Sequence, residues 1–237
     1  MHGFTDRRKV SASLPCKFVW ALMASGLMAL STATAAELLT FDVHFCVITS
    51  NKAAHAKATL AQLNKEVDIL NQYFVSESRA PLVRFRFKSA HFWHDVAALD
   101  CALVKMGDTK LSTGYLQAFN QCQHPQVRDP NAINFYVYDE TPGVNSHGRR
   151  NSNRPFVMVD WARLNHAEQS AEEHEMGHAF GLGHMCVPGA RGNTPTNIMA
   201  SHEDCQGSGG LRNIGFNAVQ VSNILHYASL IHKRLKQ

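Results

Sequence analysis

The sequence predicts an α/β fold of the α+β kind, built on a twisted sheet whose strands run mostly parallel. Two observations indicate this class. First, a strand-like run, an amphipathic helical stretch and a second strand-like run follow one another between residues 38 and 93. This order is typical of a right-handed crossover unit with parallel strands. Second, two more strand-like runs precede a helical segment in the second half, and an amphipathic helix closes the chain.

The first part of the chain supplies three of these elements. Residues 38–49 are dense in β-branched and aromatic side chains, which predicts a buried first strand. Asn51 offers an N-cap, and residues 52–74 place apolar side chains three and four positions apart, so we expect one long amphipathic helix. Residues 83–93 begin with alternating apolar and basic side chains, which predicts a half-exposed second strand.

The middle of the chain is harder to interpret. Over residues 96–128 the periodicity is weak, and we expect only a short helix at residues 113–121. Residues 132–138 and 155–161 are short apolar runs bounded by turn residues, which predicts two further strands. A loop rich in glycine, asparagine and arginine joins them.

A histidine-rich stretch, His-Glu-Met-Gly-His-Ala-Phe-Gly-Leu-Gly-His, carries the chemistry of this chain. His174 and His178 are four residues apart, so a helix stacks both imidazoles on one face, where they can bind one metal ion. Gly181 lets the chain leave the helix in a conformation that other residues resist, and His184 can then return as a third ligand. Glu175 lies about 100° further round the helix, close enough to reach a metal-bound water without being a ligand.

Three histidine ligands leave the fourth tetrahedral position for water, which is typical of a catalytic zinc ion. Zinc lowers the pKa of such a water toward ~7, and Glu175 can accept its proton as the water attacks a peptide carbonyl. We therefore predict one catalytic Zn²⁺ bound by His174, His178 and His184, with Glu175 as general base. Two plainer interpretations stay open: a helix with solvated histidines, and a structural or binuclear metal site.

The motif resembles that of the metzincin clan of zinc peptidases, in which a methionine in a tight turn lies beneath the zinc ligands. Here Asn197, Ile198, Met199 and Ala200 follow the last histidine after a short loop, and the resemblance implies that Met199 is that methionine. Some members carry a zinc-binding tyrosine two residues beyond it, where this chain has Ser201, so a fifth ligand is not expected. No metzincin subfamily can be assigned.

The resemblance also implies an architecture. Metzincins carry a short antiparallel edge strand before the last strand of the sheet, and residues 144–149 are the candidate, with a surface loop as the alternative. Such an edge can bind an extended substrate by strand addition. An upper subdomain of about residues 37–184 and a lower one of about residues 185–237 would then flank a cleft with zinc at its floor.

Two helices of this architecture have identifiable faces. Met176, Ala179 and Phe180 recur on one side of the histidine-bearing helix, and we expect them to pack beneath the sheet. Asn217 is the expected cap of the last helix. The predicted buried stripe of the last helix consists of Val221, Ile224, Leu225, Ala228, Leu230 and Ile231.

Residues 1–36 have the features of a secretory signal peptide: a basic front, an apolar run of about 13 residues and small residues for cleavage. That run is too short to span a bilayer comfortably, so no membrane anchor is expected after its removal. Residues 37–237 would form a single catalytic domain, which we expect to be monomeric and secreted or periplasmic. This part keeps 19 of the 23 Lys+Arg and 18 of the 19 Asp+Glu, and a net charge of +1 indicates no nucleic-acid partner.

Five cysteines lie beyond the signal, and an oxidising compartment favours disulfides between them. We predict the pairs Cys101–Cys122 and Cys186–Cys205, each closing a loop of about 20 residues and contributing ~3 kcal/mol in the loop-entropy model. The second pair would brace the segment between the third histidine and the turn methionine. Cys46 is expected to stay a small buried thiol. Other pairings remain compatible with the sequence.

The predicted function is that of a secreted zinc-dependent endopeptidase acting on a protein or peptide substrate. The alternative is a catalytically silent zinc-binding secreted module, adhesin-like or inhibitor-like, on the same fold; the intact Glu175 favours the enzyme. His91 and His94 lack a neighbouring carboxylate cluster, so we expect surface residues and not a second metal site.

Overall fold

The structure is a computed structural model that describes residues 37–94, 124–138, 146–164, 171–203 and 205–237. Three predictions concern residues outside these ranges: the signal peptide over residues 1–36, the short helix over residues 113–121 and the Cys101–Cys122 disulfide. Within the described part, every helix is too short or too polar to cross a bilayer.

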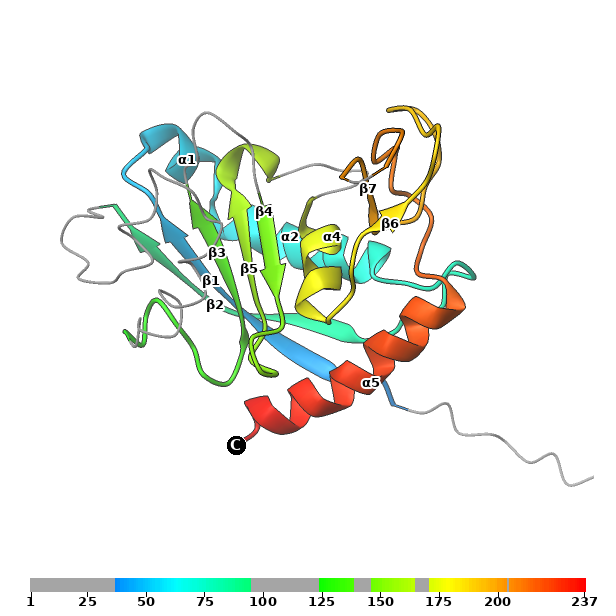
Figure 1. Cartoon of the computed structure of the whole chain (residues 1–237). Coiled ribbons are helices and arrows are strands. Elements are labelled where there is room, and N and C mark those ends of the chain that lie inside the picture. The colour runs from blue at the N-terminus through cyan, green and yellow to red at the C-terminus, as the bar shows by residue number, and fades with distance from the viewer. Residues whose placement is uncertain (1–36, 95–123, 139–145, 165–170, 204) are drawn as a thin grey trace, which may run out of the picture. The chain divides into compact units, whose positions relative to one another are not determined.

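Five strands form one sheet in the order β2-β1-β3-β5-β4 (Figure 1). They comprise β1 (Thr40–Ile48), β2 (Arg84–Trp93), β3 (Ile133–Tyr138), β4 (Ser146–Arg149) and β5 (Phe156–Asp160). The first four strands in this order run parallel to one another, and β4 pairs antiparallel with β5 at the end of the sheet. The predicted α/β class, with a mostly parallel sheet and one antiparallel edge strand, is therefore confirmed. For residues 144–149, the edge strand is the correct alternative, over Ser146–Arg149.

The burial of each strand follows from its place in the sheet. Strand β1 lies between β2 and β3, and its residues from Val43 onward are all buried, as expected for a parallel strand with neighbours on both sides. Strand β2 lies at the other end of the order and buries Phe85 while exposing Arg84 and Arg86. The predicted half-exposed second strand is thus confirmed.

Two helices follow β1: α1 (Lys52–Lys57) and α2 (Leu60–Tyr73). Asn51 caps α1, as predicted, by accepting a hydrogen bond from a first-turn N–H. The single helix expected over residues 52–74 is wrong, because Thr59 has an extended backbone and its Oγ1 accepts a hydrogen bond from the Gln62 N–H at 3.2 Å, so that Thr59 caps a second helix. The apolar spacing does not reveal this break, since Ala58 stays fully buried across it.

Aromatic rings join the sheet to the histidine-bearing helix, α4 (Ala171–Ala179). Phe180, directly after α4, contacts Phe41 at 5.4 Å and Phe74 at 5.3 Å between ring centroids. Such contacts contribute about 0.5–1.5 kcal/mol each beyond the burial of their area. Met176, Ala179 and Phe180 are fully buried in the core, as predicted, so the core holds α4 from behind.

The remaining elements are a 3₁₀ helix, η3 (Trp161–Arg163), two short strands, β6 (Met185–Cys186) and β7 (Ala200–Ser201), and the last helix, α5 (Ala218–Leu235). Asn217 caps α5 in a capping box with Gln220. The buried residues of α5 are Ile224, Ala228, Ile231 and Leu235. The prediction of Leu225 and Leu230 in this stripe is wrong, because each lies about 100° round the helix from a buried neighbour and is at least one-third exposed. Figure 1 shows α5 crossing below α4.

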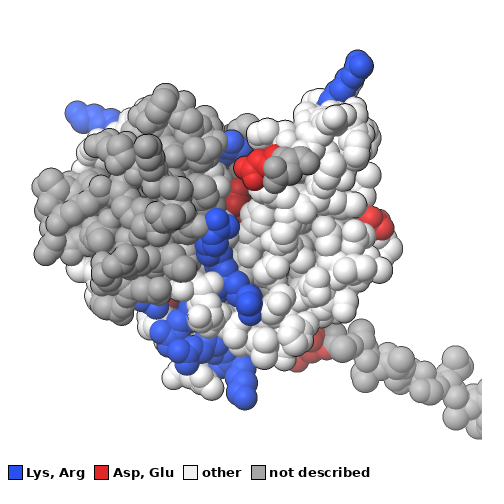
Figure 2. Space-filling view, in the orientation of Figure 1, with Lys and Arg blue, Asp and Glu red and all other residues white. Residues whose placement is uncertain are grey.

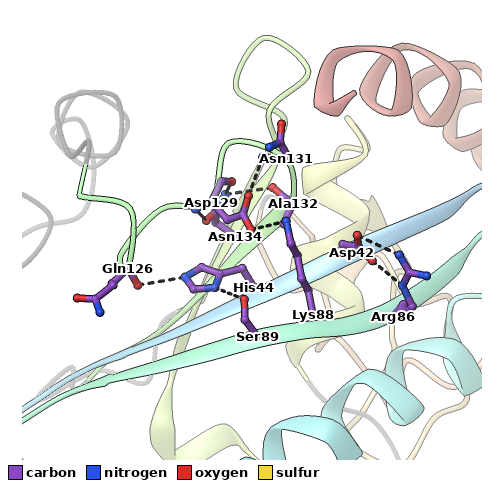
Figure 3. A network of polar contacts seen from close by, with 10 residues as sticks. All are labelled: Asp42, His44, Arg86, Lys88, Ser89, Gln126, Asp129, Asn131, Ala132 and Asn134. Atoms are coloured by element: carbon purple, nitrogen blue, oxygen red, sulfur yellow. Dashed lines mark hydrogen bonds and ion pairs between the residues drawn. The ribbon is translucent and has the colours of Figure 1, made fainter. Parts of the chain in front are cut away.

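A polar network joins the loop before β3 to strands β1 and β2 (Figure 3). The Nε2–H of His44 on β1 donates to Gln126 O at 3.1 Å, so its Nδ1 accepts a hydrogen bond from Ser89 Oγ at 2.9 Å. Lys88 on β2 forms an ion pair with Asp129. These contacts fix the loop against the sheet, and they occupy His44, so this histidine is structural.

Candidate metal centre

The helix α4 places two histidines one turn apart. The Nε2 atoms of His174 and His178 lie 3.2 Å from each other. His174 is 3% exposed, and most of the helix around it is buried as well. The first ligand is therefore shielded from bulk water, whereas His178 is half-buried and His184 is exposed, so the cluster opens to solvent on one side.

The chain then reverses and returns with the third histidine. Gly181 has a φ of +86°, in the left-handed region that favours glycine, and its N–H donates to His178 O at 2.8 Å. A Cβ at this position would also stand 2.8 Å from the ring of Tyr227. Both the backbone conformation and the packing thus require glycine here, and His184 comes back beside the other two rings, with centroid distances of 5.2 Å to His174 and 4.7 Å to His178.

Each of the three rings is oriented by a partner on its Nδ1 atom. His174 donates to Ile198 O at 2.8 Å, His178 donates to Leu182 O at 2.7 Å, and His184 lies 3.1 Å from a carboxylate oxygen of Glu203. The ligand atoms of the three side chains lie within 4.8 Å of one another. Such partners on Nδ1 fix the tautomer and turn Nε2 inward.

This hydrogen bonding fits a bound zinc ion. Since carbonyl oxygens only accept, Nδ1 carries the proton in His174 and His178, and each Nε2 presents a lone pair. Two lone pairs 3.2 Å apart repel each other unless a cation lies between them. Tetrahedral Zn²⁺ with Zn–N distances of about 2.0–2.1 Å would separate its ligand nitrogens by about 3.3–3.4 Å, close to the observed spacing.

Burial also keeps these imidazoles neutral. Burial, and after it the positive charge of Arg212, lowers the pKa of His174 to about 2. Burial lowers the pKa of His178 to about 4. Neutral imidazole is the form that ligates a metal ion, so no proton has to leave either ring at neutral pH.

Glu175 is 8% exposed, and its carboxyl group lies in the same positive surroundings. Burial raises the pKa of Glu175 to about 7, although the charge of Arg212 and the backbone N–H of Gly148 oppose the shift. A carboxyl group with this pKa exchanges its proton readily near neutral pH, which is the property of a general acid and base.

Strand β4 lies directly against α4 at this carboxylate-bearing residue. A Cβ on Gly148 would fall onto the carbonyl oxygen of Glu175 and lie 2.5 Å from its carbonyl carbon. Only glycine therefore allows the edge strand to approach the helix so closely. A glycine within a strand often marks such an approach, so this signal was present in the sequence.

The turn that contains Met199 lies beneath the histidines. Met199 is fully buried, and a Cβ on Gly177 would clash with its Sδ, so the thioether packs against α4 between the first two histidines. The side chain of Asn197 closes the turn by accepting a hydrogen bond from the Met199 N–H at 2.9 Å. Its amide also pairs reciprocally with the amide of Gln220, at 2.8 and 3.0 Å, which ties the turn to the start of α5.

A disulfide joins the two sides of this site. Cys186 and Cys205 are bonded, with 5.4 Å between their Cα atoms, which confirms the predicted pair. The strands β6 and β7 pair in parallel next to it, and the Met185 N–H donates to Met199 O at 2.7 Å. The segment after His184 is therefore fastened to the turn below it. Cys46 is a buried free thiol, as predicted.

The other candidate residues are not part of the cluster. Ser201 is buried and accepts a hydrogen bond from the Glu203 N–H, so no ligand side chain extends from that position. His94 stacks on His55 at 3.8 Å, and His91 packs on Trp93. Among the residues that the structure describes, no second group of histidine, cysteine and carboxylate side chains converges.

Sequence reasoning missed Glu203 and Arg212 as neighbours of this centre. Glu203 contacts His184, and Arg212 acts electrostatically on Glu175. No local pattern marks either residue, because both come from irregular segments that reach the site only through the folding of the chain after the turn.

A search of solved structures matches this fold to mature mirolysin of Tannerella forsythia in complex with a cleaved peptide. The TM-score is 0.52 at 9% sequence identity, and the match covers 85% of this chain and 98% of the mirolysin chain. At this identity the likeness shows the fold alone. No protein-family model and no curated protein matches the sequence.

Proposed function

We propose that this chain is a zinc-dependent endopeptidase of the metzincin type. The observation that supports this most strongly is the convergence of three histidine side chains whose Nδ1 atoms are all engaged elsewhere. In this proposal His174, His178 and His184 bind one Zn²⁺, Glu175 is the general base, and Met199 supports the ligands from below. The 3.2 Å separation of the His174 and His178 Nε2 atoms fits this ion.

The side chains divide the chemistry as follows. Glu175 accepts a proton from the attacking water and passes it to the leaving nitrogen, and a pKa of about 7 makes both transfers favourable near neutral pH. The Gly148 N–H and Arg212 stabilise its ionised form. A bound zinc ion would supply Lewis acidity toward the water and the peptide carbonyl.

The substrate is proposed to bind as an added strand on β4. This strand ends the order of the described sheet, and it pairs with β5 on one side only. An exposed strand edge binds an extended peptide through main-chain hydrogen bonds, which gives affinity without strict sequence dependence. The close approach of Gly148 to Glu175 would then bring the bound backbone next to the base. The peptide bound by mirolysin is consistent with this use of the fold.

Casein digestion by the purified, zinc-loaded protein tests the proposal. We expect digestion that stops with the chelator 1,10-phenanthroline and returns with added zinc. A Glu175→Gln variant should keep its zinc, measured by elemental analysis, and lose activity by about 10²–10⁴-fold, since general base catalysis contributes this much. Digestion that survives chelation, or a zinc-loaded Glu175→Gln variant as fast as wild type, would contradict it.

The same experiment separates the second candidate, a catalytically silent zinc-binding module. That candidate predicts stoichiometric zinc without cleavage of any member of a broad peptide library. We favour the enzyme because burial makes the ionisation of Glu175 cost stability, and its contacts with the Gly148 N–H and the charge of Arg212 offset only part of that cost.

We further propose that the protein acts outside the cytoplasm as a monomer after removal of residues 1–36. The Cys186–Cys205 disulfide supports an oxidising compartment. Sequencing the N-terminus of the exported protein should find it near Glu37, and size-exclusion chromatography with light scattering should give the mass of one chain. An N-terminus at Met1 in an exported form would contradict the cleavage.

A further inference from the structure

Arg212 lies in the segment between the methionine turn and α5, and the fold fixes its direction. Its Nε donates to Ala200 O at 2.7 Å, and its backbone N–H donates to Thr196 Oγ1 at 2.9 Å. Gly209 lies under the guanidinium, where a Cβ would stand 2.9 Å from Nε and 3.0 Å from Nη2. The φ of Arg212 is +49°, a left-handed conformation that few residues other than glycine adopt.

The anchored side chain belongs to the surroundings of the metal centre, because its charge acts on Glu175 and on His174. The turn that contains Met199 anchors both the His174 ring and the Arg212 guanidinium. Ile198 O accepts a hydrogen bond from His174, and Ala200 O accepts one from Arg212. The guanidinium also stabilises the carboxylate of Glu175 and disfavours a positive charge on His174. Arg212 is therefore a charged neighbour of the proposed reaction site.

Most of its hydrogen-bonding capacity is unused. Within the described residues, the guanidinium makes a hydrogen bond only through Nε, and no carboxylate forms an ion pair with it. Burial lowers the pKa of Arg212, although the charge of Glu175 opposes this shift. A guanidinium in this state presents its two Nη atoms as a fork that matches the two oxygens of a carboxylate.

The surroundings add to the positive charge. Arg149 and Arg163 act on the carboxylate of Glu175 together with Arg212. In the orientation of Figure 1, a band of basic side chains lies in the middle of the visible face, with acidic side chains directly above it (Figure 2). A bound divalent cation would make the centre more positive still, so an anionic substrate group is favoured over a neutral or basic one.

We propose that Arg212 determines specificity by binding a carboxylate of the substrate next to the cleaved bond. This inference rests on the proposed peptidase function and adds a substrate class to it. The carboxylate can come from an aspartate or glutamate side chain or from the free C-terminus of a short peptide, because both present the same pair of oxygens.

Matched peptides test this and separate the two sources. Peptides with Asp or Asn, and Glu or Gln, at each position flanking the cleaved bond are made with free and with amidated C-termini. We expect the wild-type protein to cleave the preferred acidic peptide about 10–100-fold faster in kcat/KM than its neutral analogue, as for a lost charge-assisted hydrogen bond. Arg212→Gln should reduce that ratio to about 1–3, and Arg212→Lys should restore part of it. Arg234→Gln removes the same charge from an exposed site on α5 and should leave the ratio unchanged.

The kcat/KM ratios identify the source of the carboxylate. If kcat/KM falls when Asp or Glu is replaced by Asn or Gln, the carboxylate is a side chain. If kcat/KM falls when the C-terminus is amidated, the carboxylate is the C-terminus. Equal cleavage of acidic and neutral peptides by wild type, or an Arg212→Gln variant that slows both by the same factor, would overturn the proposal and leave Arg212 a structural residue.

Equilibrium binding gives a readout that does not need catalysis. Calorimetry with zinc-loaded Glu175→Gln protein should show the same preference for the acidic peptide, and the added Arg212→Gln change should remove it. If the wild-type protein cleaves nothing, the peptidase proposal fails, whereas a binding preference that depends on Arg212 would still be measured. If cleavage is normal and no preference exists, only the inference about Arg212 fails.

Discussion

Replacing Gly148 by alanine should impair the proposed enzyme by pushing β4 away from α4. The added Cβ would lie 2.5 Å from the carbonyl carbon of Glu175 and nearer still to its oxygen, whereas ordinary contact begins at 3.4 Å. The strand or the helix must therefore move by at least about 1 Å, which is the displacement that the carbonyl carbon alone requires. Both obstructing atoms belong to backbone within a buried helix, so no side-chain rotation can relieve the contact.

The expected cost follows from this displacement. A misplacement of about 1 Å in a catalytic constellation lowers rates by about 100-fold, so kcat/KM should fall by at least that factor. Overpacking of a dense interior costs about 1–3 kcal/mol, so the free energy of unfolding should fall by this amount. Gly192→Ala is the matched control, because a Cβ there meets nothing within 4 Å, and it should change neither quantity measurably.

The assay is cleavage of a fluorogenic peptide by zinc-loaded protein, combined with urea denaturation and zinc analysis. Folded, zinc-loaded Gly148→Ala protein with reduced kcat/KM would support the argument. A Gly148→Ala variant with the activity and stability of Gly192→Ala would refute the claim that this contact positions the base.

Three further predictions concern the surroundings of the site. The raised pKa of Glu175, about 7 against 4.5 for the unfolded chain, means that the folded state binds more protons between these pH values, so this group costs stability as pH rises through them. Metal-free Glu175→Gln protein should therefore gain up to about 3 kcal/mol over wild type between pH 4.5 and 7.5, measured by urea denaturation, and a difference that does not change with pH would contradict this. Asn197→Ala should leave the amide of Gln220 without its buried partner and lower the free energy of unfolding by about 2–3 kcal/mol, whereas a loss below 0.5 kcal/mol would show that water replaces the amide. The double change of Cys186 and Cys205 to serine should cost about 3 kcal/mol and speed zinc loss to a chelator, because the bond fastens the segment that carries the third histidine; unchanged zinc release would show that the pairing of β6 and β7 is sufficient.

Features that depend on spacing within one segment were predictable from the sequence. Two histidines four residues apart must share a helix face, because the α-helix has 3.6 residues per turn. Gly181 marks the helix end, since a positive φ strains any residue with a Cβ. Strand periodicity was likewise predictable from local pattern, whereas the structure selects the Cys186–Cys205 pair among the pairings that the sequence left open.

Local sequence pattern did not predict the helix break at Thr59 or the buried face of α5, because tertiary packing determines both. The spacing of apolar residues continues across Ala58, so it cannot show that Thr59 starts a new helix. On α5 the sequence offers more apolar positions than the core can cover, and Leu225 and Leu230 remain exposed.

By itself, the sequence determined the histidine spacing, the reversal at Gly181 and the places of β1, β2, β3 and β5, because these follow from backbone geometry along neighbouring residues. Only the tertiary structure decided that Gly148 contacts Glu175, that Glu203 orients His184 and that the charge of Arg212 acts on Glu175. These contacts join segments far apart in the chain, and their geometry depends on how every intervening element packs. The charge around the site, and with it the proposed preference for acidic substrates, is therefore determined by tertiary packing and not by the histidine motif.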